Sequence, residues 1–290
     1  MRKSAFNYLY VIPALGMVLL FVYFPIVSNV YNSLFRMSSY SVTKTFIGFE
    51  NYTRIFKDPL FYTSIKNNAL YALFSVLCQV GFGTLLAIFL EGRYVGSRLR
   101  NFYRNVLFIP SVISISAVAL LWYFVCNPTI GLINGLLDKA GLQHLITAWL
   151  ANPKTAIFAV IAMSQWQYTG YIMVLMLVAV QKIPPELYEA AVIYGANGFR
   201  KTIHITLPSI KNMLIVSTII TIIGSFKLFA EIYVTTGGGP YNATQVLGTY
   251  MYRAAFLFDE MGFGSAIAVV IFVLTFTVSV LQMKYFSGED

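Results

Sequence analysis

The sequence predicts an all-α polytopic membrane protein with six transmembrane helices. Hydrophobic residues make up 58% of the 290 residues and charged residues only 11%, whereas a soluble domain usually carries about 25% charged residues. The apolar residues are gathered into six runs of roughly 20 residues, the length that a helix needs to cross about 30 Å of hydrocarbon. Because a backbone in lipid must satisfy its own hydrogen bonds, runs of this length are expected to be helices.

The six runs define the expected spans of one transmembrane domain over residues 1–290. They are residues 8–31, 69–90, 106–126, 155–180, 213–234 and 261–283. The first run follows Arg2 and Lys3 and is longer than the apolar part of a secretory signal peptide. We found no convincing small-residue cleavage site after it, so we expect it to remain as the first span.

Lysine and arginine residues between the runs predict the orientation. They are denser in residues 1–7, 91–105, 181–212 and 284–290 than in the other loops, and cytoplasmic loops carry the excess of such residues. The first outer loop, 32–68, also holds five of them, which weakens the contrast. The bias predicts that both termini are cytoplasmic.

Charge and composition also exclude several functions. The net charge is +9, but the cations are spread between apolar runs, which argues for membrane orientation and against nucleic-acid binding. Cys78 and Cys126 are isolated, so no disulfide framework or zinc site is expected. His144 and His204 lie in different loops, and no catalytic or metal-ligating residues converge, which argues against an enzyme. Membrane lipid is the expected surrounding of this chain.

The loop at residues 181–212 is predicted to hold two short helices. Pro184 and Pro185 favour a helix start, because proline suits the first helical turn. Asn197 and Gly198 have turn chemistry, so we expect the first helix to end there. Apolar residues recur at helical spacing along this helix, at Leu187, Ala190, Ala191 and Tyr194. A second short helix is expected before Pro208, which would open the fifth span.

This apolar stripe needs something to cover it, because the loop is too small to bury its own apolar face. Two coverings agree with the residues. The stripe could lie on the bilayer surface or against the helix bundle, or it could dock as a helix in the groove of a partner protein. The physical properties of the loop leave both open.

The spacing of residues in the same loop resembles a family motif. Glu189-Ala190-Ala191, then Gly195, Ile205 and Leu207-Pro208 resemble the EAA motif of ABC importer permeases. The resemblance implies that residues 181–212 are a coupling loop whose helix is bound in a cleft of an ATPase subunit. Tyr194 stands where the family usually has Asp, and Thr202 where it often has Phe, so details of that contact are expected to differ.

Other segments extend the resemblance over nearly the whole chain. Residues 48–52, the surroundings of Pro110 and Trp122, and residues 131–134 are similar to the carbohydrate-uptake branch, and the Gly-Gly-Gly-Pro turn at 236–240 is similar to MalF/UgpA-type subunits. This implies the type I importer permease fold in a bacterial inner membrane. The implied partners are a second, MalG/UgpE-like permease subunit, two ATPase subunits and an extracytoplasmic sugar-binding protein. The implied cargo is a sugar, and we expect an oligosaccharide.

A faint likeness to a phosphate-binding loop at residues 195–202 does not change this interpretation. The segment lacks a glycine before Lys201 and follows no predicted strand, so it cannot form the phosphate cradle. We expect no cofactor in this chain and no catalytic residue. The resemblance implies that ATP and Mg are bound by the partner ATPase.

The fourth span carries the first candidates for a sugar path. Such a path needs aromatic rings and polar side chains within an apolar bundle. The fourth span supplies Gln165, Gln167, Tyr168 and Tyr171. Glutamine is costly against lipid, so we expect at least one of the two glutamines to face the interior. Hydrogen bonding between helices is the alternative role for this group.

Three further residues join the candidates. Trp122 in the third span is either a stacking platform or an anchor at the membrane interface. Lys227 and Glu231 are spaced four residues apart in the fifth span, and charges within a membrane indicate function by default. They could line the path or pair with each other near the outer end. Lys227 in the path would favour an anionic sugar or glycerol phosphate as cargo.

An ion-coupled secondary transporter is the remaining rival. Its coupling usually requires carboxylates near the middle of the membrane. In the expected spans only Glu231 could serve, and it is near a span end. This rival is therefore less favoured than the ATP-driven importer.

Overall fold

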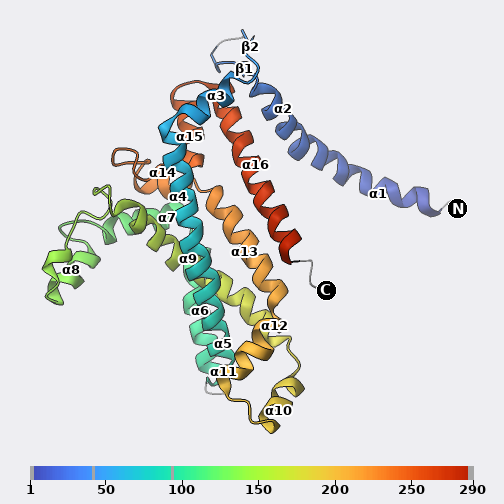
Figure 1. Cartoon of the computed structure of the whole chain (residues 1–290), viewed down its shortest axis with the longest axis vertical. Coiled ribbons are helices and arrows are strands. Elements are labelled where there is room, and N and C mark those ends of the chain that lie inside the picture. Colours follow the sequence, from blue (N-terminus) through green and yellow to red (C-terminus); the bar gives the residue numbers. More distant parts are fainter. Residues whose placement is uncertain (1–2, 41–42, 93–94, 287–290) are drawn as a thin grey trace. The chain divides into compact units, whose positions relative to one another are not determined.

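The computed structural model describes residues 3–40, 43–92 and 95–286, and the regular secondary structure of these residues is almost entirely helical (Figure 1). The chain divides into two compact units, which are described separately. One unit comprises residues 1–61 and 250–274, and the other comprises residues 62–249 and 275–290. The all-α class is confirmed, since the described strands are limited to one two-stranded hairpin.

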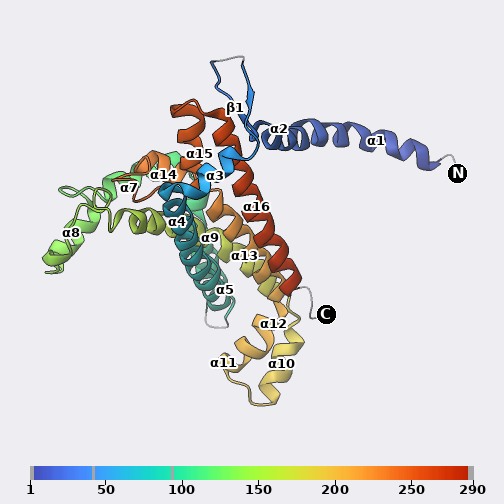
Figure 2. The same cartoon turned by 45° about the horizontal axis from the view of Figure 1, so that its top comes forward.

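The first unit begins with a long exposed helix. Helix α1 (Lys3–Val18) continues through a π-helical turn (Leu19–Tyr23) into α2 (Phe24–Asn32), and Figure 2 shows them as one continuous rod. The most apolar stretch of Tyr10–Asn32 has 0% of its residues buried within the protein. An apolar helix that no part of its own chain covers fits a helix that faces lipid.

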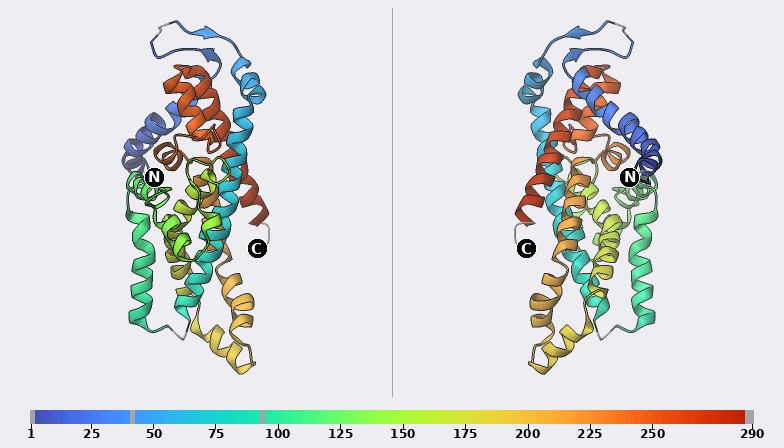
Figure 3. Two further views of the ribbon diagram at one scale, coloured as in Figure 1. Left: turned by 90° about the vertical axis from the view of Figure 1, so that its left-hand side faces the viewer. Right: turned by 90° about the vertical axis from the view of Figure 1, so that its right-hand side faces the viewer.

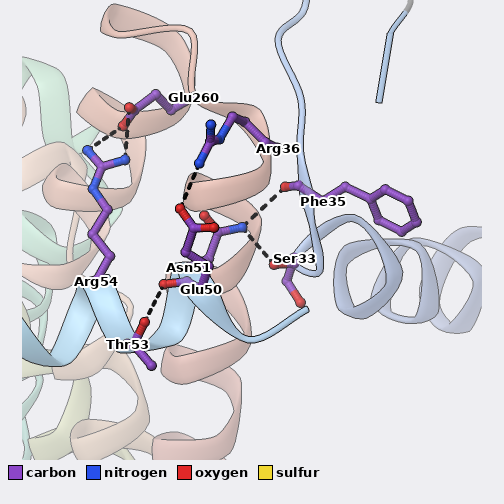
Figure 4. Close-up of polar contacts among 8 residues, drawn as sticks. All are labelled: Ser33, Phe35, Arg36, Glu50, Asn51, Thr53, Arg54 and Glu260. Atoms are coloured by element: carbon purple, nitrogen blue, oxygen red, sulfur yellow. Dashed lines mark hydrogen bonds and ion pairs between the residues drawn. The ribbon is translucent and has the colours of Figure 1, made fainter. Parts of the chain in front are cut away.

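The remaining elements of this unit form a small outer cap. They are β1 (Phe35–Arg36), β2 (Thr45–Phe46), α3 (Glu50–Lys57), part of α15 (Leu247–Tyr252), a π-helical turn (Arg253–Leu257) and the first half of α16 (Met261–Phe286). Side-chain bonds join these pieces (Figure 4). Asn51 Nδ2 donates to the carbonyl oxygens of Ser33 at 2.8 Å and Phe35 at 3.2 Å. Both guanidinium NH groups of Arg54 donate to Glu260 at 2.8 Å, the bidentate geometry that arginine favours.

Asp259 holds the hairpin connection to this cap. Its carboxylate accepts hydrogen bonds from the hydroxyls of Ser38 and Ser39 and from the Ser39 backbone N–H. These bonds, with Ser38 the largest contributor, lower the pKa of Asp259. A carboxyl whose folded pKa is lowered contributes stability above its unfolded pKa, and that contribution is lost as the pH falls through the folded pKa.

Asp259→Asn is expected to loosen residues 38–40. The φ of 56° at position 259 suits asparagine, so the change removes the charge with little backbone strain. We expect amide hydrogen exchange at residues 38–40 to accelerate about fivefold at neutral pH, the size of one ordinary hydrogen bond, because water screens the charge at this exposed site. Corrected exchange in the wild-type protein should approach that of the variant as the solution is acidified. Equal exchange in both proteins at neutral pH would contradict this role.

The second unit is a bundle around helix α9. Its elements are α4 (Pro59–Ser75, which begins in the first unit), a π-helical segment (Val76–Phe82), α5 (Gly83–Glu91), α6 (Ser97–Val112), α7 (Ile115–Val125), α8 (Leu132–Lys139), a short 3-10 helix (Gln143–Leu145), α9 (Ala156–Gln181), α10 (Pro185–Ile193), α11 (Gly198–Lys201), a second π-helical segment (Thr202–Thr206), α12 (Leu207–Ser209), α13 (Lys211–Phe226) and α14 (Ala230–Thr235). Helix α9 contacts α5, α6, α7, α13 and α14. Apart from the polar residues between Ser164 and Thr169, its apolar residues are spread around the whole helix, as expected at the centre of a bundle.

The described helices include three that could each cross a membrane unbroken, Tyr10–Asn32, Pro59–Glu91 and Met261–Lys284, and up to six spans if bent pairs are counted. Two expected spans are not continuous helices. Residues 106–126 are divided between α6 and α7, which meet at 99°, and residues 213–234 are divided between α13 and α14.

Each break has a physical explanation in the hydrogen bonds around it. Pro110 lacks a backbone N–H, and the chain leaves the helix at Ile113, whose carbonyl oxygen accepts from Gln167 Nε2 at 3.1 Å. At the second break the Ser225 carbonyl oxygen accepts from Asn68 Nδ2 at 2.6 Å. Neighbouring helices thus satisfy the carbonyls that the breaks release, as the interior of a membrane bundle requires.

Candidate functional site

Residues 181–212 form a projecting corner at one end of the bundle of the second unit (Figure 3). Pro184 has extended backbone and Pro185 begins α10, as the sequence predicts. The predicted helix end at Asn197 and Gly198 is wrong, because α10 ends earlier, at Ile193, and Gly195 closes its C-terminal turn. The Ala196 N–H donates to the Ala191 carbonyl at 2.8 Å, and the Gly195 N–H to the Val192 carbonyl at 2.9 Å.

This pair of hydrogen bonds is the Schellman motif. In this helix ending, the residue that follows the C-cap adopts the left-handed backbone conformation. Gly195 has a φ of +75° there, a conformation that costs glycine nothing and other residues about 1–2 kcal/mol. Asn197 is the N-cap of the next helix, α11, because its side-chain Oδ1 accepts a hydrogen bond from the Arg200 N–H at 2.9 Å. The glycine of the motif is therefore required by the backbone.

The motif residues divide into an inner and an outer set. Ile205 and Leu207 pack against the buried cluster that contains Val180, Ile183 and Ile210. The Tyr188 hydroxyl lies 2.9 Å from Thr206 Oγ1 and joins α10 to the segment that carries Ile205. The other motif residues are exposed or half-buried, namely Glu189, Ala190, Ala191, Gly195 and Pro208. The inner set anchors the loop, and the outer set is available to a partner.

Large apolar side chains surround the outer set. We call them the corner patch, and they are Leu187, Val192, Ile193, Tyr194, Phe199 and Ile203. Ile193 is 84% exposed and Tyr194 is 90% exposed. The sequence pattern found Leu187 and Tyr194 but missed Ile193 and Phe199, because Ile193 lies outside the stripe at the end of α10 and Phe199 belongs to α11. An apolar patch rimmed by polar residues marks an interaction site.

A separate cavity of about 250 Å³ lies within the second unit, between the helices of the bundle. Its lining combines tyrosine rings, hydroxyl and amide groups and one carboxylate. The lining residues are Tyr71, Ser75, Gln79, Tyr168, Tyr171, Ile172, Ile220, Thr221, Gly224, Ser225, Leu228 and Glu231. Aromatic faces with a few polar groups can bind a hydroxylated ring.

Of the four candidates from the fourth span, two line this cavity and two do not. Tyr168 and Tyr171 line it. Gln167 is only 1% exposed, and its amide donates to the Ile113 carbonyl, so it holds the break between α6 and α7. Gln165 Nε2 donates to Ser75 Oγ at 3.3 Å and to the Ile161 carbonyl at 3.0 Å. The glutamines make contacts inside the bundle and lie outside the lining of the cavity.

Of the other three candidates, Glu231 lines the cavity, whereas Trp122 and Lys227 do not. Trp122 packs against Trp166 with ring centroids 6.2 Å apart and does not line the cavity. Of the two roles that the sequence left open for Lys227 and Glu231, the structure does not support pairing along one helix, because α13 ends at Phe226 and α14 begins at Ala230. Among the described residues no ion pair joins them. Lys227 is exposed, whereas Glu231 lines the cavity.

Several lining residues escaped the sequence analysis. Ser75 and Gln79 in the second span, and Thr221 and Ser225 in the fifth, are each four residues apart. Polar pairs at this spacing share one helix face, so they were a usable signal. The sequence pattern does not predict which helices turn these polar faces toward each other.

The family follows from comparison with known proteins. A family model described as "Binding-protein-dependent transport system inner membrane component" matches residues 80–287. The chain belongs to this family. The predicted resemblance to ABC importer permeases is thereby confirmed, and this permease is a membrane transport component and not an enzyme.

Individual relatives agree over the full length of the permease. It is 49% identical over 290 residues to the probable ABC transporter permease protein YurN of Bacillus subtilis (strain 168), covering 100% of this chain and 99% of YurN. It is 33% identical over 292 residues to the arabinooligosaccharides transport system permease protein AraP of the same organism, covering 99% and 91%. Its fold resembles a chain in the crystal structure of a bacterial ABC transporter involved in the import of the acidic polysaccharide alginate. That likeness has a TM-score of 0.86 and 23% identity, over 99% of this chain and 96% of the other.

Proposed function

We propose that this permease forms half of the translocation path of an ATP-driven importer for a sugar, with an oligosaccharide as the expected cargo. The observation that carries the proposal is the corner patch around the matching motif. Apolar side chains on a projecting corner, held by Ile205 and Leu207 where they pack against the buried cluster, suit a helix that docks in a groove. An ATPase subunit is the partner that this motif implies.

The family description supports a proposal for the rest of the assembly. Dependence on a binding protein is part of the family description, and we propose that this protein binds a sugar outside the cell. A second, MalG/UgpE-like permease would supply the other half of the path. Two ATPase subunits would bind ATP and Mg on the side of residues 181–212, which makes that side and both termini cytoplasmic.

Two observations support a sugar as the cargo. The cavity presents the rings of Tyr168 and Tyr171 together with hydroxyl and amide groups, a combination that suits stacking and hydrogen bonding to a sugar ring. The relative AraP, named for arabinooligosaccharides, is similar over 99% of this chain.

Charge reversal at Glu189 tests the coupling. We expect Glu189→Lys to lower transport-coupled ATP hydrolysis of the assembled transporter by roughly threefold to tenfold, the size of a lost charge-assisted contact at an interface. Glu186→Lys is the matched control, since it reverses the same charge near the start of the same helix. The measurement is binding-protein-stimulated hydrolysis in proteoliposomes.

The outcomes separate the proposal from its rivals. Unchanged hydrolysis in Glu189→Lys would remove the proposed docking. Equal losses in both variants would indicate a general effect of charge on α10. Uptake that continues without ATP but follows a proton gradient would indicate an ion-coupled secondary transporter.

A further inference from the structure

The charge on the described lining of the cavity is negative. Of the described residues that line it, Glu231 alone carries a charge. Lys227, the cation nearest to it in the sequence, is exposed and is absent from the lining. In the described part of the chain no lysine, arginine or histidine forms an ion pair with Glu231. The cavity therefore contains a carboxylate that no cation in the described part of the chain neutralises.

A second observation indicates that the cavity is built for a hydrogen-bonding ligand. Thr221 is only 7% exposed and lines the cavity, yet its Oγ1 has no hydrogen-bond partner in the described structure. A buried hydroxyl without a partner is costly, and a ligand hydroxyl would satisfy it. The nearby Ser225 hydroxyl does not satisfy it, since that hydroxyl donates to the Thr221 carbonyl at 2.8 Å.

We propose that Glu231 is a specificity-determining residue that makes this half of the path select neutral sugars and reject saccharides that carry a carboxylate or phosphate. The inference rests on the proposed function and narrows its substrate class. It runs opposite to the anionic cargo that Lys227 suggested in the sequence, because Glu231 and not Lys227 reaches the cavity.

The selection has two physical parts. An ionised carboxylate accepts hydrogen bonds only, and its bonds to sugar hydroxyls are charge-assisted and stronger than neutral ones. The same group repels a second negative charge, and the repulsion is large because the cavity wall is largely apolar and screens little. A neutral sugar gains these hydrogen bonds without repulsion, whereas an anionic sugar is also repelled by the carboxylate.

Matched glycosides test this proposal. The assembled transporter in nanodiscs is titrated with methyl glucoside and methyl glucuronide, which share a pyranose ring and differ in charge, and binding is followed by saturation-transfer NMR. We expect the wild-type protein to bind the glucoside at least about tenfold more tightly, and Glu231→Gln to reduce the ratio to within about threefold by tightening the glucuronide. Glu231→Asp keeps the charge and should keep the preference.

The controls isolate the cavity. Lys227→Gln also removes one charge, close in the sequence but outside the cavity, and should leave the wild-type ratio unchanged. Thr221→Val should weaken both glycosides to a similar extent. Equal binding of the two glycosides by the wild-type protein, no binding of either, or an unchanged ratio in Glu231→Gln would overturn the proposal.

Failure of this inference is distinguishable from failure of the proposed function. A transporter that hydrolyses ATP in response to its binding protein but shows no charge preference overturns only the role of Glu231. Loss of the Glu189 effect on hydrolysis overturns the coupling role, and the ratio of the two glycosides can still be measured.

Discussion

Replacing Gly195 with valine is expected to lower ATP-driven uptake by more than tenfold. Gly195 ends α10 with a φ of +75°, and a β-branched residue is strained in this conformation. The strain would break the hydrogen bond from the Ala196 N–H to the Ala191 carbonyl at the end of α10. It would also shift α10 relative to Thr206, to which the helix is hydrogen-bonded. A displaced helix transmits little of the ATPase motion, so uptake falls while sugar binding remains.

The comparison variants show whether the backbone is the cause. A Cβ atom at Gly195 would meet nothing within 4 Å, so a loss in the valine variant points to the backbone conformation rather than to crowding at this position. Gly195→Asn should retain most of the activity, because asparagine tolerates the left-handed region. Gly198→Val changes a nearby glycine whose φ is not positive and that also has open space around it, and it should have a small effect. Equal losses in Gly195→Asn and Gly195→Val would contradict the backbone explanation.

Gly170→Ala is expected to destabilise the bundle by about 3 kcal/mol, at the upper end for adding one methyl group to a packed interior. At this residue α9 crosses α6 so closely that a Cβ atom would overlap the carbonyl group of Leu107 and reach the Phe108 nitrogen at 3.0 Å. Backbone atoms cannot turn aside as a flexible side chain can. The two helices would have to separate, and contacts along their whole crossing would weaken.

Reversible unfolding of the full chain in mixed detergent micelles would measure this loss. Gly135→Ala is the matched control, because Gly135 lies within helix α8 and a Cβ atom there meets nothing within 4 Å. It should stabilise by about 0.5–1 kcal/mol through helix propensity. A Gly170→Ala protein as stable as the wild type would show that the crossing of α6 and α9 is looser than the structure indicates.

Much of the architecture could be predicted because it depends on local properties of the chain. The length and apolarity of each run predict a membrane helix without knowledge of its neighbours. The two prolines at 184 and 185 correctly predict the start of α10. The end of α10 was predicted too late, since both Gly195 and Asn197 are turn residues and only the hydrogen bonds assign one to the end and the other to a new start.

The candidate site was predicted less completely because polar residues in a span have several uses. Gln167 and Tyr168 are adjacent, yet the first bonds a released carbonyl of α6 and α7 and the second lines the cavity. Lys227 and Glu231 have helical spacing in the sequence, but a break in the helix separates their environments. Such breaks depend on hydrogen bonds from other helices, and a hydropathy pattern does not contain them.

The sequence by itself determined the all-α membrane class, the family motif in residues 181–212 and the identity of the polar residues within the spans. The tertiary structure alone decided which of those residues meet in one cavity and which satisfy broken helices. The physical reason is that burial in a membrane depends on composition along one helix, whereas a binding site depends on how several helices are rotated and where they cross. The position of Glu231 in the cavity, away from Lys227, is the clearest result of that second level of organisation.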